Sequence, residues 1–183
     1  MVMLTLGTGI GGGVIANGRL IHGDTDCAGE IGHMVIEASG VKCACGNFGC
    51  LEAYASANSL VRRFREAVAA GEDSSLSAAI HSGETVDARA ICQAAMAGDA
   101  AAARIFHETA VYLGVGIVNI LHIINPARVV IAGGLINAGE LLMRPIRDTV
   151  RARALPDSYR RCDIVFATLG EDAGFIGGAG CAS

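Results

Sequence analysis

The chain has 183 residues, of which 52% are hydrophobic and 17% are charged. These proportions indicate a packed globular protein and exclude a disordered one. The formal net charge is −4 and the basic residues are scattered, so this segment lacks the basic face that nucleic-acid binding needs. Seven cysteines, an odd number with no signal peptide before them, favour a reduced cytoplasmic protein over a disulfide scaffold.

The first part of the chain predicts three strands. Residues 1–6 are apolar and end at a glycine, as a short buried strand does. Residues 13–16 and 19–21 predict two more strands, joined by the dipeptide Asn17-Gly18. This dipeptide is a strong hairpin signal because both residues tolerate positive φ.

The middle of the chain predicts helices. Apolar residues at helical spacing indicate one helix over residues 51–70, and residues 74–98 indicate short helices with polar breaks. A long helix is expected over residues 99–124, with an aspartate cap at its start and Asn-Pro after its end. Its most apolar part, residues 111–124, contains two polar residues and is too short to cross a bilayer, so no membrane is expected.

The last part of the chain alternates strands and helices. Strands are expected at 129–132 and 164–167, and helices at 141–154 and from residue 173 onward. Strands, then helices, then alternating elements indicate an α/β chain with a mixed sheet. Because Met1 stands directly at a core strand and the last helix has barely begun where the sequence stops, we expect a piece of a longer protein.

A glycine-rich stretch, Gly-Thr-Gly-Ile-Gly-Gly-Gly at residues 7–13, follows the first strand. It matches the G-x-G-x-x-G pattern, but a dinucleotide site needs a helix directly after the glycines, and a strand with a hairpin turn follows here. No Gly-Lys-Ser/Thr follows either, which excludes a Walker loop. Two interpretations remain: a turn whose backbone N–H groups and Thr8 hydroxyl hold an anion, or a tight turn that simply needs small residues.

Four residues at close spacing predict a metal site: His33, Cys43, Cys45 and Cys50. Three thiolates and one imidazole complete the tetrahedral shell of Zn²⁺ and leave no open position, so the zinc is expected to be structural.

Two glutamates, Glu30 and Glu52, bracket the predicted zinc ligands, and a metal would fold them toward each other. Taken alone, they are solvated or orienting groups, or they belong to a binding site. The second ring nitrogen of His33 is free to bond a ligand. A metal that orders polar side chains beside a phosphate-sized glycine loop indicates a phosphoryl-transfer enzyme.

Together these motifs resemble the ROK family, which groups bacterial sugar kinases with sugar-responsive repressors. The resemblance covers residues 1–183 as the family's second, C-terminal domain, with a zinc-binding segment at 29–52. The stretches that carry it are the phosphate loop at 7–13, the sugar signature at 28–33, the zinc signature at 43–52, the strand and glycine pair at 125–134, and the start of the last helix at 172–177.

The resemblance implies an actin-like, RNase H-like ATPase lobe from a truncated two-lobe kinase whose N-terminal lobe is absent. Glu30, His33 and Glu52 would then bind sugar hydroxyls. Gly7, Thr8 and Gly9 would hold the phosphates of ATP, and Gly133 and Gly134 would border the nucleoside. The family's general base is an aspartate on the other lobe, so we expect no catalytic residue in this chain and no activity from it alone.

In full length, the resemblance implies a glucokinase-like hexose kinase that is cytoplasmic, homodimeric and dependent on structural Zn²⁺, ATP and Mg²⁺. The alternative is the effector domain of a ROK repressor, although the intact glycine loop with Thr8 favours a kinase. A third interpretation is a zinc-containing module that binds sugar or a partner without activity. Neither the hexose nor the choice of ATP or polyphosphate as donor follows from the sequence.

Overall fold

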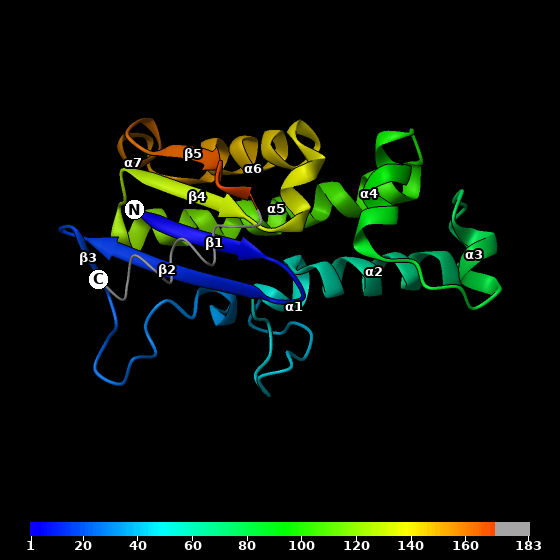
Figure 1. Cartoon of the computed structure of the whole chain (residues 1–183), viewed down its shortest axis with the longest axis horizontal. Helices are drawn as coiled ribbons and strands as arrows, with labels where there is room; N and C mark the ends of the chain where they lie inside the picture. The colour runs from blue at the N-terminus through cyan, green and yellow to red at the C-terminus, as the bar shows by residue number, and fades with distance from the viewer. Residues whose placement is uncertain (171–183) are drawn as a thin grey trace.

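The computed structural model of the protein describes residues 1–170. The helix expected from residue 173 and the family stretch at 172–177 therefore lie outside the described residues. The described part consists of a mixed sheet backed by two long helices, a helical extension at one end, and a long looped segment below the sheet (Figure 1).

The sheet has five strands in the order β3-β2-β1-β4-β5. The strands are β1 (Val2–Leu6), β2 (Ile10–Ala16), β3 (Arg19–Leu20), β4 (Arg128–Ala132) and β5 (Asp163–Phe166). β1, β2 and β3 pair antiparallel as a meander, whereas β4 and β5 run parallel to β1. The expectation of a mixed sheet is confirmed.

The second strand begins earlier than the sequence indicated. β2 starts at Ile10, so the glycines at 11–13 pair with β1 as part of the strand, and only residues 7–9 form the turn. The prediction of a glycine loop as far as residue 13 was wrong because these residues are paired with β1, and at Gly11 and Gly12 a side chain would not fit. A Cβ on Gly12 would overlap the carbonyl oxygen of Gly29 and lie 2.8 Å from the Ile31 side chain.

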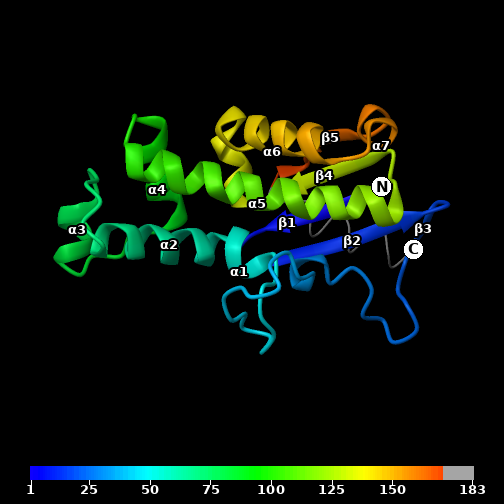
Figure 2. The same cartoon turned by 180° about the vertical axis from the view of Figure 1, so that it is seen from behind.

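The described chain also contains seven α-helices and two 3₁₀ helices. The α-helices are α1 (Glu52–Ala55), α2 (Ala57–Ala69), α3 (Ser77–His81), α4 (Ala88–Met96), α5 (Ala100–Ile124), α6 (Glu140–Arg153) and α7 (Pro156–Arg160). The 3₁₀ helices are η1 (Ile31–His33) and η2 (Gly134–Ala138). α5 and α6 lie side by side on one face of the sheet, and α2, α3 and α4 extend beyond its end (Figure 2).

The helix expected over residues 51–70 is broken into α1 and α2. Ser56 has an extended backbone, with φ −74° and ψ 165°, and its hydroxyl accepts a hydrogen bond from the Ser59 N–H. Serine competes for helix backbone donors in this way, which makes it a good N-cap and a poor interior residue. The break directs the Ala57 N–H to the carbonyl oxygen of Gly7, at 2.9 Å, so α2 begins against the glycine turn.

The long helix α5 supplies much of the core. Its Phe106, Leu113, Ile117 and Leu121 side chains are 0% exposed, and the helix packs against α2, α4 and α6. By length and composition α5 could cross a membrane, but half of its most apolar window is buried inside the protein. Within residues 1–170, α5 therefore has the position of a core helix rather than a free apolar span.

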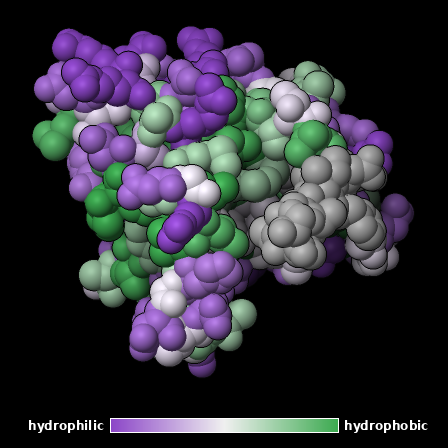
Figure 3. All heavy atoms as spheres, turned by 60° about the vertical axis from the view of Figure 1, so that its left-hand side comes forward, coloured by the Kyte–Doolittle hydropathy of each residue, from purple (hydrophilic) through white to green (hydrophobic). Residues whose placement is uncertain are grey.

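Hydrophobic side chains are exposed at the end of the sheet that carries β3. Met1 is 42% exposed there, beside Ile15, Leu20 and Ile21 on the neighbouring ends of β2 and β3. Figure 3 views the molecule from this side, with hydrophobic surface visible between hydrophilic areas.

Candidate functional site

One cavity of about 420 Å³ brings together almost all of the residues predicted to bind sugar and ATP. It is lined by Thr5, Leu6, Gly7, Gly9, Ile10, Gly11, Glu30, His33, Glu52, Gly133 and Gly134. Only Thr8 among the predicted set is missing. Residues from four separate stretches of the sequence thus meet in one place.

The sheet explains why these stretches meet. β1 ends at Leu6 and the parallel strand β4 ends at Ala132, so the turn at 7–9 and the Gly133-Gly134 pair emerge at the same edge. Ligands of open α/β sheets bind beyond the carboxyl ends of the strands, which is where this cavity lies.

Thr8 is exposed at the tip of the glycine turn and does not line the cavity. The turn itself is held by its backbone: the Gly7 N–H donates to the Gly9 carbonyl oxygen at 3.0 Å. Thr5, next to the last residue of β1, lines the cavity instead. The sequence offered little sign of this, because a threonine in a strand is ordinary.

Glu52 connects the glycine turn with the cysteine cluster. One carboxylate oxygen, Oε2, accepts a hydrogen bond of 2.8 Å from the Ile10 N–H, and the other, Oε1, lies 3.9 Å from Cys43 Sγ. A Cβ at Gly9 would be 3.0 Å from Glu52 Cδ and closer still to Oε2. Gly9 therefore lacks a side chain at the point where the Glu52 carboxylate reaches the turn.

The four predicted metal ligands converge beside this carboxylate. The ligand atoms of His33, Cys43, Cys45 and Cys50 all lie within 4.8 Å of one another. Cys43 Sγ is 3.8 Å from His33 Nδ1, and Cys45 Sγ is 3.7 Å from Cys50 Sγ. Ligand atoms of a tetrahedral zinc site are about 3.5–3.8 Å apart when Zn–S is about 2.3 Å and Zn–N about 2.0 Å. The residues therefore fit Zn²⁺ in number, type and spacing.

The thiols of the cluster differ in acidity. Burial, together with the neighbouring thiols of Cys45 and Cys43, raises the pKa of Cys50 to about 12. The pKa of Cys45 is lowered, chiefly by a hydrogen bond from the backbone of Asn47. Three thiolates cannot share this space unless a positive charge offsets their repulsion, which a bound metal ion supplies.

His33 faces both parts of the site. Its Nδ1 points to the cysteines, and its Nε2 lies 3.8 Å from Glu30 Oε2. The short helix η1 makes this possible, since Glu30 is its N-cap residue and His33 its last residue. One ring nitrogen is thus available to a metal while the other lines the cavity with Glu30.

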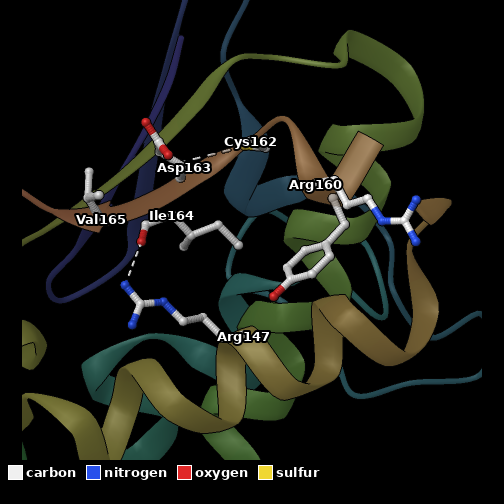
Figure 4. Close-up of a pocket in the computed structure, with 7 residues that line it drawn as sticks. Arg147, Arg160, Cys162, Asp163, Ile164 and Val165 are labelled. Carbon is white, nitrogen blue, oxygen red and sulfur yellow. Dashed lines mark hydrogen bonds between the residues drawn. The ribbon is translucent and has the colours of Figure 1, made fainter. Parts of the chain in front are cut away.

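A second cavity of about 320 Å³ lies beside β5, the edge strand of the sheet, and α6. Arg147 crosses it and donates to the Ile164 carbonyl oxygen at 3.0 Å, while the Arg160 guanidinium points away from both (Figure 4). Asp163 pairs with Arg128 at 3.0 Å. The charged groups of this second cavity are thus engaged in structural contacts or directed outward. The first cavity is therefore the better candidate for function.

A family model, described as the ROK family, matches residues 1–183. The chain belongs to the ROK family. Among curated ROK relatives, the glucokinase of Halalkalibacterium halodurans is 42% identical over 97% of this chain and 54% of its own length. The DNA-binding transcriptional repressor Mlc of Escherichia coli is 31% identical over 98% of this chain and 43% of its own length.

Solved ROK structures confirm the predicted actin-like fold. The ROK glucokinase of Streptomyces griseus, determined in complex with glucose and AMPPNP, matches with a TM-score of 0.84 at 33% identity. The match covers 98% of this chain and 59% of that one. The chain spans about half the length of the glucokinase relatives it matches.

Proposed function

We propose that this chain is the sugar- and ATP-binding half of a ROK hexose kinase, which transfers the γ-phosphoryl group of ATP to the 6-hydroxyl of glucose or a similar hexose. The single observation that carries the proposal is the shared cavity. Glu30, His33 and Glu52 line it together with the glycine turn and the Gly133-Gly134 pair. Acceptors and donors for sugar hydroxyls thus adjoin bare backbone suited to phosphates.

In the proposed arrangement, Glu30, His33 Nε2 and Glu52 hydrogen-bond the sugar. Gly7 and Gly9 hold the ATP phosphates from the cavity wall, Thr8 reaches them from the exposed tip of the turn, and Gly133 and Gly134 border the nucleoside. The glucokinase relatives and the structure containing AMPPNP support this assignment. Phosphoryl transfer depends mainly on positioning and charge stabilisation, and Mg²⁺ bound with ATP would spread the developing negative charge.

His33 Nδ1 and the thiolates of Cys43, Cys45 and Cys50 would hold Zn²⁺. When bound, the zinc supplies a fixed tetrahedral anchor for these ligands rather than a reacting centre. His33 is then held in one orientation, and its Nε2 is presented to the cavity beside Glu30. The zinc site would therefore preorganise the sugar side of the cleft.

The general base would be an aspartate on a second lobe, outside this domain, so we propose that residues 1–183 alone bind ligands but do not turn over. The complete kinase would be cytoplasmic and homodimeric. The net charge of −4 supports small-molecule rather than nucleic-acid recognition by this segment.

A second candidate is the effector domain of a ROK repressor. The match to Mlc over 98% of the chain favours it. A repressor would bind the sugar but would have no use for ATP, so nucleotide turnover separates the two.

The test measures zinc per chain, glucose binding by isothermal titration and ATP turnover, for this chain and for a version that includes the upstream coding sequence. Zinc at one per chain, with turnover in the extended version only, is the expected result. Sugar binding without turnover in either version would favour the repressor.

A matched pair of variants tests the sugar site directly. Glu30→Gln removes a charge from the cavity, and we expect it to raise the Kd for glucose about tenfold or more. Glu37→Gln makes the same change in the same segment at an exposed side chain outside the cavity, and glucose binding should not change. Equal effects of the two variants would contradict the assignment of Glu30.

A further inference from the structure

Tyr54 is buried behind the cysteine cluster. It lies on α1, two residues after Glu52, and is only 7% exposed. With Cys43, Cys50 and Ala53 it forms a small hydrophobic cluster distinct from the main core. The tyrosine is therefore part of the immediate surroundings of the metal ligands, although it offers no ligand atom to them.

The Tyr54 hydroxyl accepts a hydrogen bond of 2.8 Å from the Val41 N–H. The Val41 carbonyl oxygen in turn accepts from the Gly49 N–H at 2.9 Å. Val41 lies two residues before Cys43, and Gly49 directly precedes Cys50. Val41 therefore connects the segment before Cys43 with the segment before Cys50, and the Tyr54 hydroxyl fixes the position of Val41.

The loop is shaped around this hydroxyl. Gly40 passes so close that a Cβ there would overlap the Tyr54 oxygen and would lie 2.9 Å from the Glu37 carbonyl oxygen. The Gly40 N–H donates to that same carbonyl at 3.1 Å, which closes the turn. A hydroxyl enclosed by a glycine turn and bonded to a backbone N–H is a specific contact rather than incidental packing.

The ring that carries the hydroxyl is anchored to the core. Tyr54 packs on Tyr112 of α5, with ring centroids 4.7 Å apart and an interplanar angle of 41°. The Arg63 guanidinium lies 5.5 Å from the centre of the Tyr112 ring and forms an ion pair with Glu108 at 2.9 Å. Tyr54 therefore connects a loop without regular structure to α5, a helix of the core.

We propose that Tyr54 is a positioning residue for the zinc site. Its hydroxyl fixes the segment before Cys43, so that Cys43 Sγ faces His33 Nδ1 at 3.8 Å, close enough for both atoms to bind one Zn²⁺. The proposal rests on the proposed zinc site and is independent of the assignment of sugar, nucleotide or kinase activity.

Tyr54→Phe removes the hydroxyl and keeps the ring. Tyr112→Phe is the matched control, because it makes the same chemical change on the adjacent ring, whose hydroxyl has no hydrogen-bond partner among residues 1–170. Zinc affinity is measured by competition with a chromophoric chelator, and ligand geometry from the visible absorption of the Co²⁺-substituted protein. We expect Tyr54→Phe to raise the zinc Kd about tenfold and to shift the Co²⁺ bands, with Tyr112→Phe unchanged.

Several results would overturn the proposal. One is wild-type zinc affinity and an unaltered Co²⁺ spectrum in Tyr54→Phe, and another is an equal loss in both variants, which would indicate general loosening of the ring pair. If Tyr54→Phe does not fold, Gly40→Ala displaces the loop from the same hydroxyl, and retention of full zinc affinity there would also overturn the role. Absence of zinc from the wild-type protein would overturn both the zinc site and the role of Tyr54. If the wild-type protein binds zinc, the zinc affinity of Tyr54→Phe tests the role of Tyr54 alone.

Discussion

Substitution of Gly9 by alanine tests whether the Glu52 carboxylate is held against the glycine turn. The new Cβ would stand 3.0 Å from Glu52 Cδ, whereas carbon atoms in ordinary contact are about 3.5–4.0 Å apart. The carboxylate must therefore retreat by roughly 1 Å, which lengthens its 2.8 Å hydrogen bond to the Ile10 N–H beyond bonding distance. Because the displaced atoms are at the end of the flexible Glu52 side chain, we expect the backbone of the turn to keep its conformation.

The loss follows from that one contact. A hydrogen bond to a charged group contributes about 1.5–3 kcal/mol, and water can replace part of it at this open cavity, so we expect unfolding to require about 1–2 kcal/mol less. The displaced carboxylate should also raise the Kd for glucose about tenfold in the extended protein, which corresponds to about 1.4 kcal/mol. Urea unfolding measures the first quantity and isothermal titration the second.

Gly13→Ala is the control for this substitution. It adds the same methyl group to the same glycine-rich stretch, but its Cβ would meet nothing within 4 Å, and Gly13 does not line the cavity. Its glucose affinity should equal that of the wild type. If Gly9→Ala also bound glucose like the wild type, the reasoning that Glu52 is positioned for sugar by the turn would be refuted, even if stability fell as expected.

Three further predictions concern the metal, the core and pH. Cys50→Ser should abolish stoichiometric zinc binding, measured by metal analysis, and lower the melting temperature, measured by calorimetry. Cys27→Ser, at an exposed cysteine outside the cluster, should change neither quantity. Phe106→Ala, at a side chain that is 0% exposed, should cost about 3–5 kcal/mol in urea unfolding, and a loss below about 1 kcal/mol would contradict its place in the core. Burial would raise the pKa of Asp99, but hydrogen bonds from Ala102 and two serines lower it to about 2. A lowered pKa stabilises the fold above the unfolded value, so Asp99→Ala should cost about 1 kcal/mol at neutral pH, and the difference from wild type should fade as the pH falls from about 4 to about 2. A difference that is constant with pH would show that the carboxylate charge is not involved.

The elements that sequence predicted well are those with local causes. The long helix was expected over 99–124 and is found at Ala100–Ile124, because its aspartate cap, apolar periodicity and Asn-Pro ending all act within a few residues. The metal cluster was equally predictable, since ligand types and spacing are visible in the chain. The break at Ser56 was missed because it depends on contacts with Ser59 and with a glycine turn about fifty residues away.

The extent of the glycine turn was also beyond sequence reasoning. Gly12 reads as part of a loop, yet it is a strand residue whose bare backbone admits the segment around Gly29. Tyr54 and Thr5 were missed for a related reason. Each is an ordinary residue for its element, and only the tertiary arrangement places the Tyr54 hydroxyl at the Val41 N–H and Thr5 at the cavity.

The position of Glu52 indicates how the proposed zinc site would influence the turn proposed to bind phosphates. Its carboxylate lies between Cys43 Sγ and the Ile10 N–H, and its backbone carbonyl accepts the Ser59 hydroxyl behind the start of α2. A shift of Cys43 would thus reach the turn through one side chain, without rearrangement of the sheet. In the proposed kinase this contact would couple sugar and nucleotide halves of the cleft, because the residue that meets the sugar also fixes the backbone that meets the phosphates.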